Sequence, residues 1–245
     1  PTSDGTAETG EWVGQNSPAT TGEITFGNVL LATFKASSKK IALPVELIQD
    51  SGIDVVAFVI NRLVQRLGRL SNTAYTVGSG SAQPFGVVPR ATAGKTGTTG
   101  QTLTVIYADL VDLMHSVNSA YRANAKFMMN DLSVRNVRKL VDANGRPIFT
   151  PGYEAGITQG VPDLLLGKQL VVNDDVAVMA ANAKSILFGD FKQFVLRDVA
   201  GSMVVRRFDD SAFALNGQVG FCGWMRTGSN LMDTAAVKYY ANSAT

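Results

Sequence analysis

Apolar and polar positions along the chain predict extended structure first and a long helix next. Residues 24–43 carry β-favouring apolar side chains at short intervals, broken at Gly27-Asn28, and residues 35–40 have the pattern of a polar turn. Beyond residue 44 the apolar side chains recur at steps of three and four, the spacing of one face of an amphipathic helix. The residues of this face are Ile53, Val56, Ile60, Leu63 and Leu67.

Three residues set the expected course of this helix. Pro44 suits a first helical turn, and Gly68 lies near the expected end, where glycine is common. Gly52 lies inside the pattern and costs about 1 kcal/mol relative to alanine, which predicts a weak point or a break there.

The middle of the chain predicts a connection and shorter elements. Residues 71–104 form a glycine-rich connection, a helix is expected at about 106–124, and a short strand at 127–129. Asp131 is the expected N-cap of another short helix, and Asn144-Gly145 marks the exit from it. The apolar residues of that helix are Val134, Val137 and Leu140.

Beyond residue 160 the pattern is nearly all β. Ala200-Gly201 predicts a hairpin turn. Asn216-Gly217 predicts another turn, and one long strand running through it is the alternative. The expected strands are 164–173, 185–190, 193–199, 202–208, 212–227 and 235–241. The chain is therefore expected to have an α+β fold.

The first 23 residues form a segment of a different kind. They are rich in Thr, Ser, Gly and Asn, show no periodicity and cannot bury enough apolar surface to fold alone. Trp12 and Val13 stand out, because an aromatic side chain on such a segment usually docks on another surface.

Composition excludes several classes of function. The 245 residues include 22 basic and 20 acidic side chains, a balance that does not indicate strong binding to nucleic acid or to an anionic membrane. The single cysteine, Cys222, excludes internal disulfides and thiolate-rich metal sites. His115 is the single histidine, and its apolar neighbours at helical spacing predict a place on a helix surface. No basic region followed by an apolar stretch indicates a secretion signal, and no apolar run reaches membrane-spanning length.

The stretch AGKTGTTG, residues 93–100, resembles a phosphate-binding loop only in part. Such a loop needs an opening glycine where this chain has Pro89, and a helix directly after the Lys95-Thr96 pair. Thr96 to Gly100 is a poor helix start, so a glycine-rich connection is the better interpretation. The carboxylate pairs Asp174-Asp175 and Asp209-Asp210 lie at turn-like positions. We therefore expect no catalytic, cofactor-binding or metal-binding residues.

A series of short motifs resembles the major capsid proteins of tailed bacteriophages, which have the Hong Kong 97-type fold. Their order and spacing between residues 11 and 240 make the set specific. The motifs are Glu11-Trp12-Val13 with Ile24 to Val29, Leu43 to Ser51, Gly78 to Gly86, Gly145-Arg146-Pro147, Leu165 to Gln169, Leu187 to Phe191 and Ala235 to Lys238. They are similar, in turn, to the family's extended loop, the lead into its long spine helix, its GxGxxQPxG connection and its later segments. The resemblance implies that AGKTGTTG is a variable tail on the connection that follows the spine helix, and that its glycines provide flexibility.

The resemblance implies an extended loop, a peripheral domain and an axial domain. The expected bounds are 1–43 for the loop, 44–105 with about 198–232 for the peripheral domain, and 106–197 with about 233–245 for the axial domain. The family's chains usually begin with an arm, so residues upstream of this sequence are expected to have been cleaved or left out. The loop is expected to overlap a neighbouring subunit through Trp12 and Val13.

The resemblance also implies the function and the partners. Many copies are expected to form pentamers and hexamers that close into an icosahedral shell around double-stranded DNA, held by weak nonspecific contact. The protein is expected in the virion, after assembly in the bacterial host cytoplasm, with no membrane and no cofactor. Portal, scaffold and decoration proteins are candidate partners. Arg62, Arg66 and Arg69 form a basic row on the long helix, which can be solvated, contact a neighbouring subunit or contact packaged DNA.

One chemistry of the family is not carried over, and alternatives remain. Some members join subunits by a Lys–Asn bond assisted by a Glu, but residues 1–34 contain no Lys and no Glu follows Glu154. The nearest alternative function is an encapsulin, which shares the fold and encloses cargo enzymes. A nucleotide-binding enzyme and a monomeric binding module are the alternatives from other classes.

Overall fold

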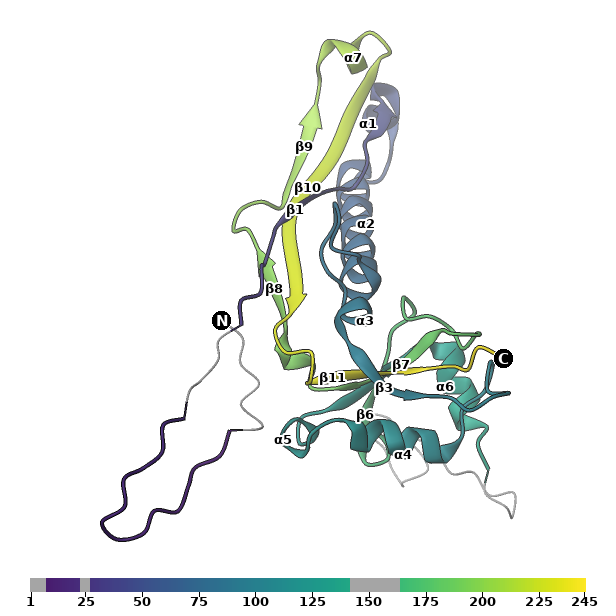
Figure 1. Cartoon of the computed structure of the whole chain (residues 1–245). Helices are drawn as coiled ribbons and strands as arrows, with labels where there is room; N and C mark the ends of the chain where they lie inside the picture. The colour runs from purple at the N-terminus through teal and green to yellow at the C-terminus, as the bar shows by residue number, and fades with distance from the viewer. Residues whose placement is uncertain (1–7, 23–26, 142–163) are drawn as a thin grey trace, which may run out of the picture. The chain divides into compact units, whose positions relative to one another are not determined.

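The computed structural model describes residues 8–22, 27–141 and 164–245, and the chain forms two compact units (Figure 1). The long-helix unit comprises residues 31–89 and 196–230. The six-strand unit comprises residues 1–30, 90–195 and 231–245.

The long-helix unit begins its helical part with a break where the sequence predicts one. Helix α1 spans Val45–Asp50 after Pro44, and helix α2 spans Val55–Val77. The Asp54 side chain caps α2 by accepting a hydrogen bond from the Ala57 N–H at 2.9 Å. The intervening residues 51–54 contain Gly52, so the predicted weak point is confirmed as a break.

The expected end of the long helix was wrong. Gly68 lies inside α2 on its exposed side, where an added Cβ would meet nothing within 4 Å, so the helix tolerates it. The helix ends at Gly78 instead, whose N–H donates to the Ala74 carbonyl at 2.9 Å. A Cβ on Gly78 would lie 2.2 Å from the Pro84 carbonyl oxygen, so only glycine fits this close return of the chain.

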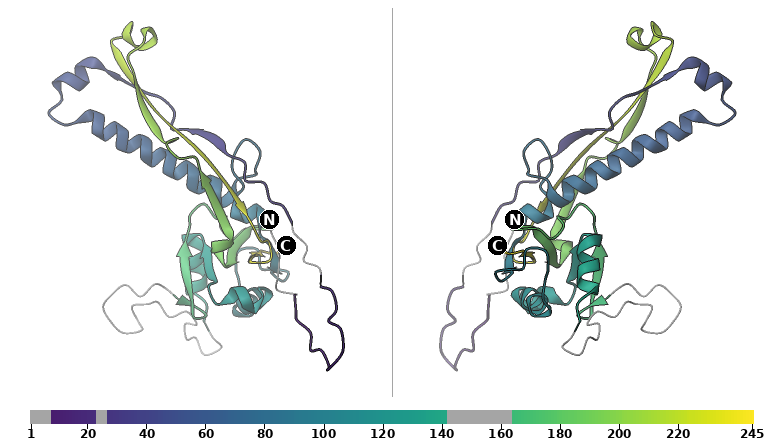
Figure 2. Two further views of the ribbon diagram at one scale, coloured as in Figure 1. Left: turned by 90° about the vertical axis from the view of Figure 1, so that its left-hand side faces the viewer. Right: turned by 90° about the vertical axis from the view of Figure 1, so that its right-hand side faces the viewer.

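The buried face of α2 differs in part from the expected one. Leu63 and Leu67 are buried as predicted, but Ile53 and Ile60 are exposed, and Val59 takes the place of Ile60 in the buried row. Val59 and Leu63 pack against Val219 and Phe221 of strand β10 (Gln218–Leu231), and α2 runs beside this strand in Figure 2. Val59, Leu63 and Leu67 are spaced by four residues and therefore share one face of the helix. Ile53 lies before the first residue of α2 and so cannot belong to that face.

The sheet of the long-helix unit is organised around β10. Strands β1 (Phe34–Ser37), β2 (Ile41–Pro44) and β9 (Val204–Phe208) pair with it antiparallel, and β8 (Phe194–Asp198) also pairs with it. Residues 34–37 and 41–44 are thus strands of this sheet, where the sequence predicted a polar turn over 35–40 and an extended loop up to 43.

The two turn signals had different outcomes. Ala200-Gly201 makes a turn, with Gly201 at φ 69°, but it does not close a hairpin, because β8 and β9 each pair with β10. Asn216-Gly217 is confirmed as a turn: Gly217 has φ 63°, and β10 begins directly after it. The short helix α7 (Ser211–Ala214) precedes this turn, in a region predicted as strand.

The six-strand unit contains a mixed sheet in the order β3-β11-β7-β4-β6-β5. Strand β11 pairs parallel with β3 and antiparallel with β7, and β4 pairs parallel with β6 and antiparallel with β7. The strands are β3 Thr92–Thr96, β4 Lys126–Met129, β5 Leu164–Leu165, β6 Lys168–Val172, β7 Lys184–Gly189 and β11 Val237–Ala241. The helices of this unit are α4 Tyr107–Ser116, α5 Ser119–Arg122, α6 Asp131–Arg138 and the 3-10 helix η2 Phe191–Gln193, and the short helix α3 (Val87–Arg90) lies at the end of the long-helix unit.

The core of this unit lies between the sheet and helices α4 and α6. Phe127 of β4 and Phe188 of β7 are fully buried, and their ring centroids are 4.5 Å apart. Leu110 and Leu113 of α4 and Val134 and Val137 of α6 belong to the same cluster. Burial of each such side chain contributes about 1.5–3 kcal/mol to the stability of the fold. The apolar residues that predicted α6 therefore also anchor this helix to the core.

Several sequence predictions for this unit need adjustment. The helix expected at 106–124 is two helices, because Asn118 caps a new helix by accepting from the Ala120 N–H at 3.0 Å. Asn130, and not Asp131, caps α6, by accepting from the Leu132 N–H at 2.9 Å. The strand at 127–129 is confirmed. Asn144-Gly145 and the Gly145-Arg146-Pro147 motif lie outside the described residues.

Candidate assembly surfaces

The loop of residues 8–22 presents its aromatic side chain to solvent. The chain doubles back at Gly14 to Ser17, where the Ser17 N–H donates to the Gly14 carbonyl at 3.1 Å (Figure 1). Glu11 accepts hydrogen bonds from the hydroxyl and the backbone N–H of Thr20, and these bonds lower its pKa. Trp12 is fully exposed and Val13 is exposed as well. Hydrogen bonds between residues of the loop therefore stabilise its conformation, while its apolar side chains are exposed to solvent.

The three arginines of the predicted basic row lie on the exposed side of α2. Arg62, Arg66 and Arg69 are all exposed. The Arg62 guanidinium lies 5.1 Å from the ring centroid of Phe58, which is itself half exposed, and Arg62 donates to the Gln65 amide oxygen at 3.4 Å. Within the described ranges no carboxylate forms an ion pair with these three arginines. Their role as a contact between subunits stays a prediction.

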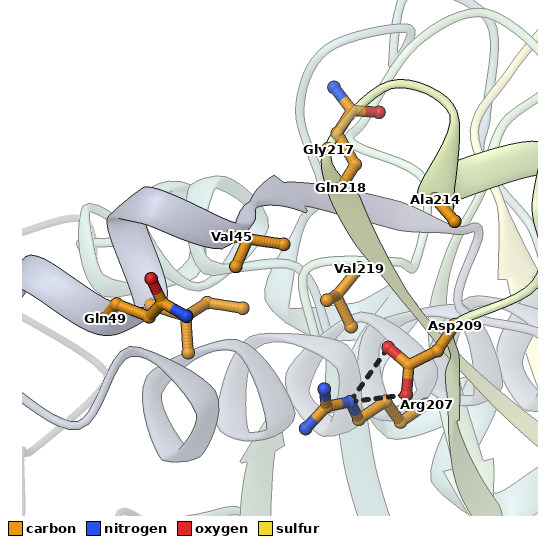
Figure 3. Close-up of a pocket in the computed structure, with 9 residues that line it drawn as sticks. Val45, Gln49, Arg207, Asp209, Ala214, Gly217, Gln218 and Val219 are labelled. Atoms are coloured by element: carbon orange, nitrogen blue, oxygen red, sulfur yellow. Dashed lines mark hydrogen bonds and ion pairs between the residues drawn. The ribbon is translucent and has the colours of Figure 1, made fainter.

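A hollow that the sequence did not predict lies where α1, β9 and β10 meet (Figure 3). It has a volume of about 360 Å³, with Val45 and Val219 on its walls. Arg207 and Asp209 close one side as an ion pair, with 3.0 Å between Nε and Oδ2. Both side chains are more than half exposed, so the pair contributes little to stability. No local pattern could reveal this hollow, because its walls come from segments more than 150 residues apart.

Lys95, the residue that suggested a phosphate-binding loop, is instead a member of an ion-pair network in the six-strand unit. Its ammonium nitrogen lies 2.5 Å from Oδ2 of Asp112 and 3.6 Å from Oδ1 of the buried Asp109. The hydrogen bond to Asp112 raises the pKa of Lys95, so the amine is held protonated. Asp109 also accepts a hydrogen bond from the Tyr240 hydroxyl at 3.3 Å.

Gly94 and Gly97 of the same stretch are tightly packed, so this part of the chain is not a flexible tail, which corrects that expectation. Residues 93–96 belong to β3, and a Cβ on Gly94 would lie 2.4 Å from the Ser116 hydroxyl oxygen. A Cβ on Gly97 would lie 2.4 Å from the Tyr240 hydroxyl oxygen. The glycines allow β3 to approach α4 and β11 closely, which explains a glycine-rich sequence without any ligand.

The described residues hold little that could perform chemistry. His115 lies at the end of α4, and its Nδ1 is 3.1 Å from a guanidinium nitrogen of Arg122. Cys222 is buried in β10. Over the described ranges no three His, Cys, Asp or Glu side chains come close enough to hold a metal ion. A search of the same residues found no helix with the length and apolar character needed to span a membrane.

The family comparison covers almost the whole chain. The model of the phage capsid family matches residues 1–242. No curated protein matches the chain in sequence.

Solved structures with the same fold are capsids and phages. The capsid of a native GTA particle has a TM-score of 0.81 and 24% identity over 96% of this chain and 82% of that one. The capsid of an empty GTA particle has a TM-score of 0.78 and 25% identity over 96% and 81%. A structure from Gordonia phage Cozz has a TM-score of 0.69 and 15% identity over 97% of this chain and 79% of that one. The α+β fold is thus the Hong Kong 97-type fold, as the motifs suggested. The chain belongs to the phage capsid family and is a structural, non-enzymatic shell protein of the virion that assembles from many copies of itself.

Proposed function

We propose that the chain is the major capsid protein of an icosahedral phage head, in which pentamers and hexamers enclose double-stranded DNA. The observation that carries this proposal is the structural likeness, at a TM-score of 0.81 over 96% of the chain, to a GTA capsid that was computed with C5 symmetry. Assembly would take place in the host cytoplasm, and portal, scaffold and decoration proteins are candidate partners of such a shell.

The loop of residues 8–22 supports an assembly role. The indole of Trp12 is exposed on an irregular loop, so it lacks the stabilisation that burial gives an aromatic side chain. Contact with a neighbouring subunit would bury it. Many copies of one modest contact add up strongly in a closed shell, because each subunit is held at several sites at once. Trp12 and Val13 are therefore proposed to lie at a contact between subunits.

The two compact units overlap the two expected domains with different bounds: residues 31–43 lie in the long-helix unit, and residues 90–105 lie in the six-strand unit. We infer that the long-helix unit is the peripheral domain and that the six-strand unit carries the axial domain around the symmetry axis of each capsomer. The sequence gives the long-helix unit ten basic and six acidic side chains. This modest excess of positive charge supports weak, nonspecific contact with packaged DNA.

Removal of residues 1–23 tests this proposal. The deleted protein should fold, because the helices and both sheets begin after residue 30. It should nevertheless fail to form stable shells in negative-stain micrographs at concentrations where the full chain assembles. A milder variant, Trp12→Ala, should weaken assembly in the same direction, and Gly10→Ala is its matched control because a Cβ there meets nothing within 4 Å. Deleted protein that assembles as well as the full chain would show that the segment is no intersubunit element.

A further inference from the structure

The turn that leads into β10 carries an asparagine followed directly by a glycine, Asn216-Gly217. The other pair of this kind, Asn144-Gly145, lies outside the described residues. Asn216 is exposed, and so is Leu215 before it. A Cβ on Gly217 would meet nothing within 4 Å, so no other residue crowds the peptide bond between Asn216 and Gly217.

Two hydrogen bonds at the surface hold this pair in place. The Asn216 side-chain amide donates to the Ala212 carbonyl at 3.3 Å. The Gly217 N–H donates to the Ala214 carbonyl at 3.0 Å. Hydrogen bonds of an exposed loop open at a small cost in free energy. When both open, the Gly217 nitrogen can approach the amide carbon of Asn216.

We propose that Asn216 is a modification site, at which the side chain converts without an enzyme to aspartate and isoaspartate through a cyclic succinimide. The Gly217 nitrogen attacks Cγ of Asn216, a C–N bond forms there, and the bond from Cγ to Nδ2 breaks. The side-chain nitrogen leaves as ammonia and carries away the proton that the Gly217 nitrogen loses. Water then opens the ring, at the Cγ carbonyl to give aspartate or at the main-chain carbonyl to give isoaspartate. No atom is oxidised or reduced, and water is the co-reactant.

Many other asparagines of the described residues lack these conditions. Burial or a helical backbone keeps the neighbouring nitrogen from the side chain, because the chain cannot bend locally toward it. The buried ones are Asn130, Asn230 and Asn242, and those inside α2 are Asn61 and Asn72.

Asn16 is a matched counterpart within the same chain. It is exposed and lies in a turn, and the N–H of the next residue, Ser17, donates to the Gly14 carbonyl at 3.1 Å. The Gly217 N–H is held in the same way by a carbonyl three residues earlier. The two sites therefore differ in the residue that supplies the attacking nitrogen. Glycine leaves the backbone free to reach the attacking geometry, whereas a serine side chain restricts it.

The modification has a structural consequence for the start of α1. The Gly217 carbonyl accepts a hydrogen bond from the Val45 N–H at 2.9 Å, and both residues line the hollow of Figure 3. Isoaspartate adds a methylene group to the main chain directly before Gly217, which displaces this carbonyl. Aspartate keeps the length of the main chain and adds only a charge. The isoaspartate form should therefore lose the bond to Val45, and the aspartate form should keep it.

Peptide mapping of the full chain after incubation in warm, mildly alkaline buffer tests the site. Trypsin releases residues 208–226, which contain Asn216 and neither Asn16 nor Asn144. Tandem mass spectrometry should place the mass gain of an amide-to-acid conversion on residue 216, in two products that elute separately. Conversion should be at least about fivefold faster than at Asn16, because glycine supplies the attacking nitrogen.

Two variants and one further measurement sharpen the test. Asn216→Gln should abolish the conversion, and Ser17→Gly should accelerate conversion at Asn16 toward the rate at Asn216. Hydrogen exchange at the Val45 amide should be faster in the isoaspartate fraction, whereas the variant Asn216→Asp should exchange like the unmodified chain.

Three results would overturn the proposal. Conversion in denaturant but none in the folded chain would show that the two surface hydrogen bonds protect the site. Aspartate without isoaspartate would exclude the succinimide. Equal rates at Asn16 and Asn216 would contradict the role of the glycine.

Discussion

The hydroxyl of Tyr240 lies 3.3 Å from a carboxylate oxygen of Asp109, and both residues are buried in the six-strand unit. Tyr240 belongs to β11 and Asp109 to α4, while Lys95, 3.6 Å from the other carboxylate oxygen, belongs to β3. One buried carboxylate thus links β3 and α4 to β11, although Tyr240 lies 131 residues beyond Asp109 in the sequence. Its polar partners explain how a charged side chain is accommodated there.

We expect Asp109→Ala to lower the free energy of unfolding by about 3 kcal/mol, the lower end for breaking a buried ion pair, because the partly exposed Lys95 can turn toward water. Asp109→Asn should cost less, since an amide oxygen can still accept from Tyr240. Chemical denaturation of the disassembled protein measures both. Equal losses for the two variants would contradict the role given to the hydrogen bond.

Stability should fall at alkaline pH. Burial, reinforced by the charge of Asp109, raises the pKa of Tyr240 above its ordinary value of about 10. Because the folded state then holds this proton more tightly than the unfolded state, the contribution is complete below pH 10 and is lost as the pH rises beyond it. Tyr240→Phe should give a shallower decline above pH 10. Tyr75, whose pKa burial also raises, and Lys95 would still cause part of the decline. An unchanged alkaline slope would refute the assignment.

Two glycines should respond in opposite directions to the same substitution. Gly94→Ala should destabilise the protein by about 1–3 kcal/mol, because the new methyl group would lie 2.8 Å from a Leu113 methyl carbon and 2.4 Å from the Ser116 oxygen. Gly68→Ala should stabilise by up to about 1 kcal/mol, because it removes backbone freedom in α2 without meeting another atom. Thermal unfolding of the two variants compares them directly, and shifts of the same sign would contradict the packing described.

Local signals in the sequence predicted elements well and their partners poorly. Gly52 marked a real break because Asp54 caps a new helix two residues later. Gly68 was tolerated because a single exposed glycine costs only about 1 kcal/mol. Ala200-Gly201 formed a turn, but the partner of both neighbouring strands is β10, which the turn residues do not encode. Gly94 and Gly97 suggested flexibility because the contacts that require them, with Ser116 and Tyr240, come from other elements of the fold.

The candidate surfaces were predictable to a similar extent. Trp12 and the basic row on α2 could be identified from the chain, because an aromatic on a polar segment and a helical charge spacing are local features. The hollow lined by Val45 and Val219 could not, since these residues come from segments that are far apart in the sequence and meet only in the fold.

Changing Arg62, Arg66 and Arg69 to Gln should weaken capsomer association more than it changes DNA retention. The chain is nearly neutral overall, and exposed guanidinium groups on one helix suit paired contacts with carboxylates of an adjacent subunit. Sedimentation of the assembled particles and release of DNA at increasing salt separate the two effects. Normal assembly combined with salt-dependent loss of DNA would instead indicate that the three arginines contact the packaged DNA.

The central claim is closure into a shell, and the particle mass of the purified full chain tests it most directly. Measured by charge-detection mass spectrometry, with negative-stain micrographs of the same sample, the protein should give closed particles of megadalton mass built from the 26.0 kDa chain. A protein that remains monomeric, or stops at small oligomers over a wide range of concentration and salt, would contradict the account.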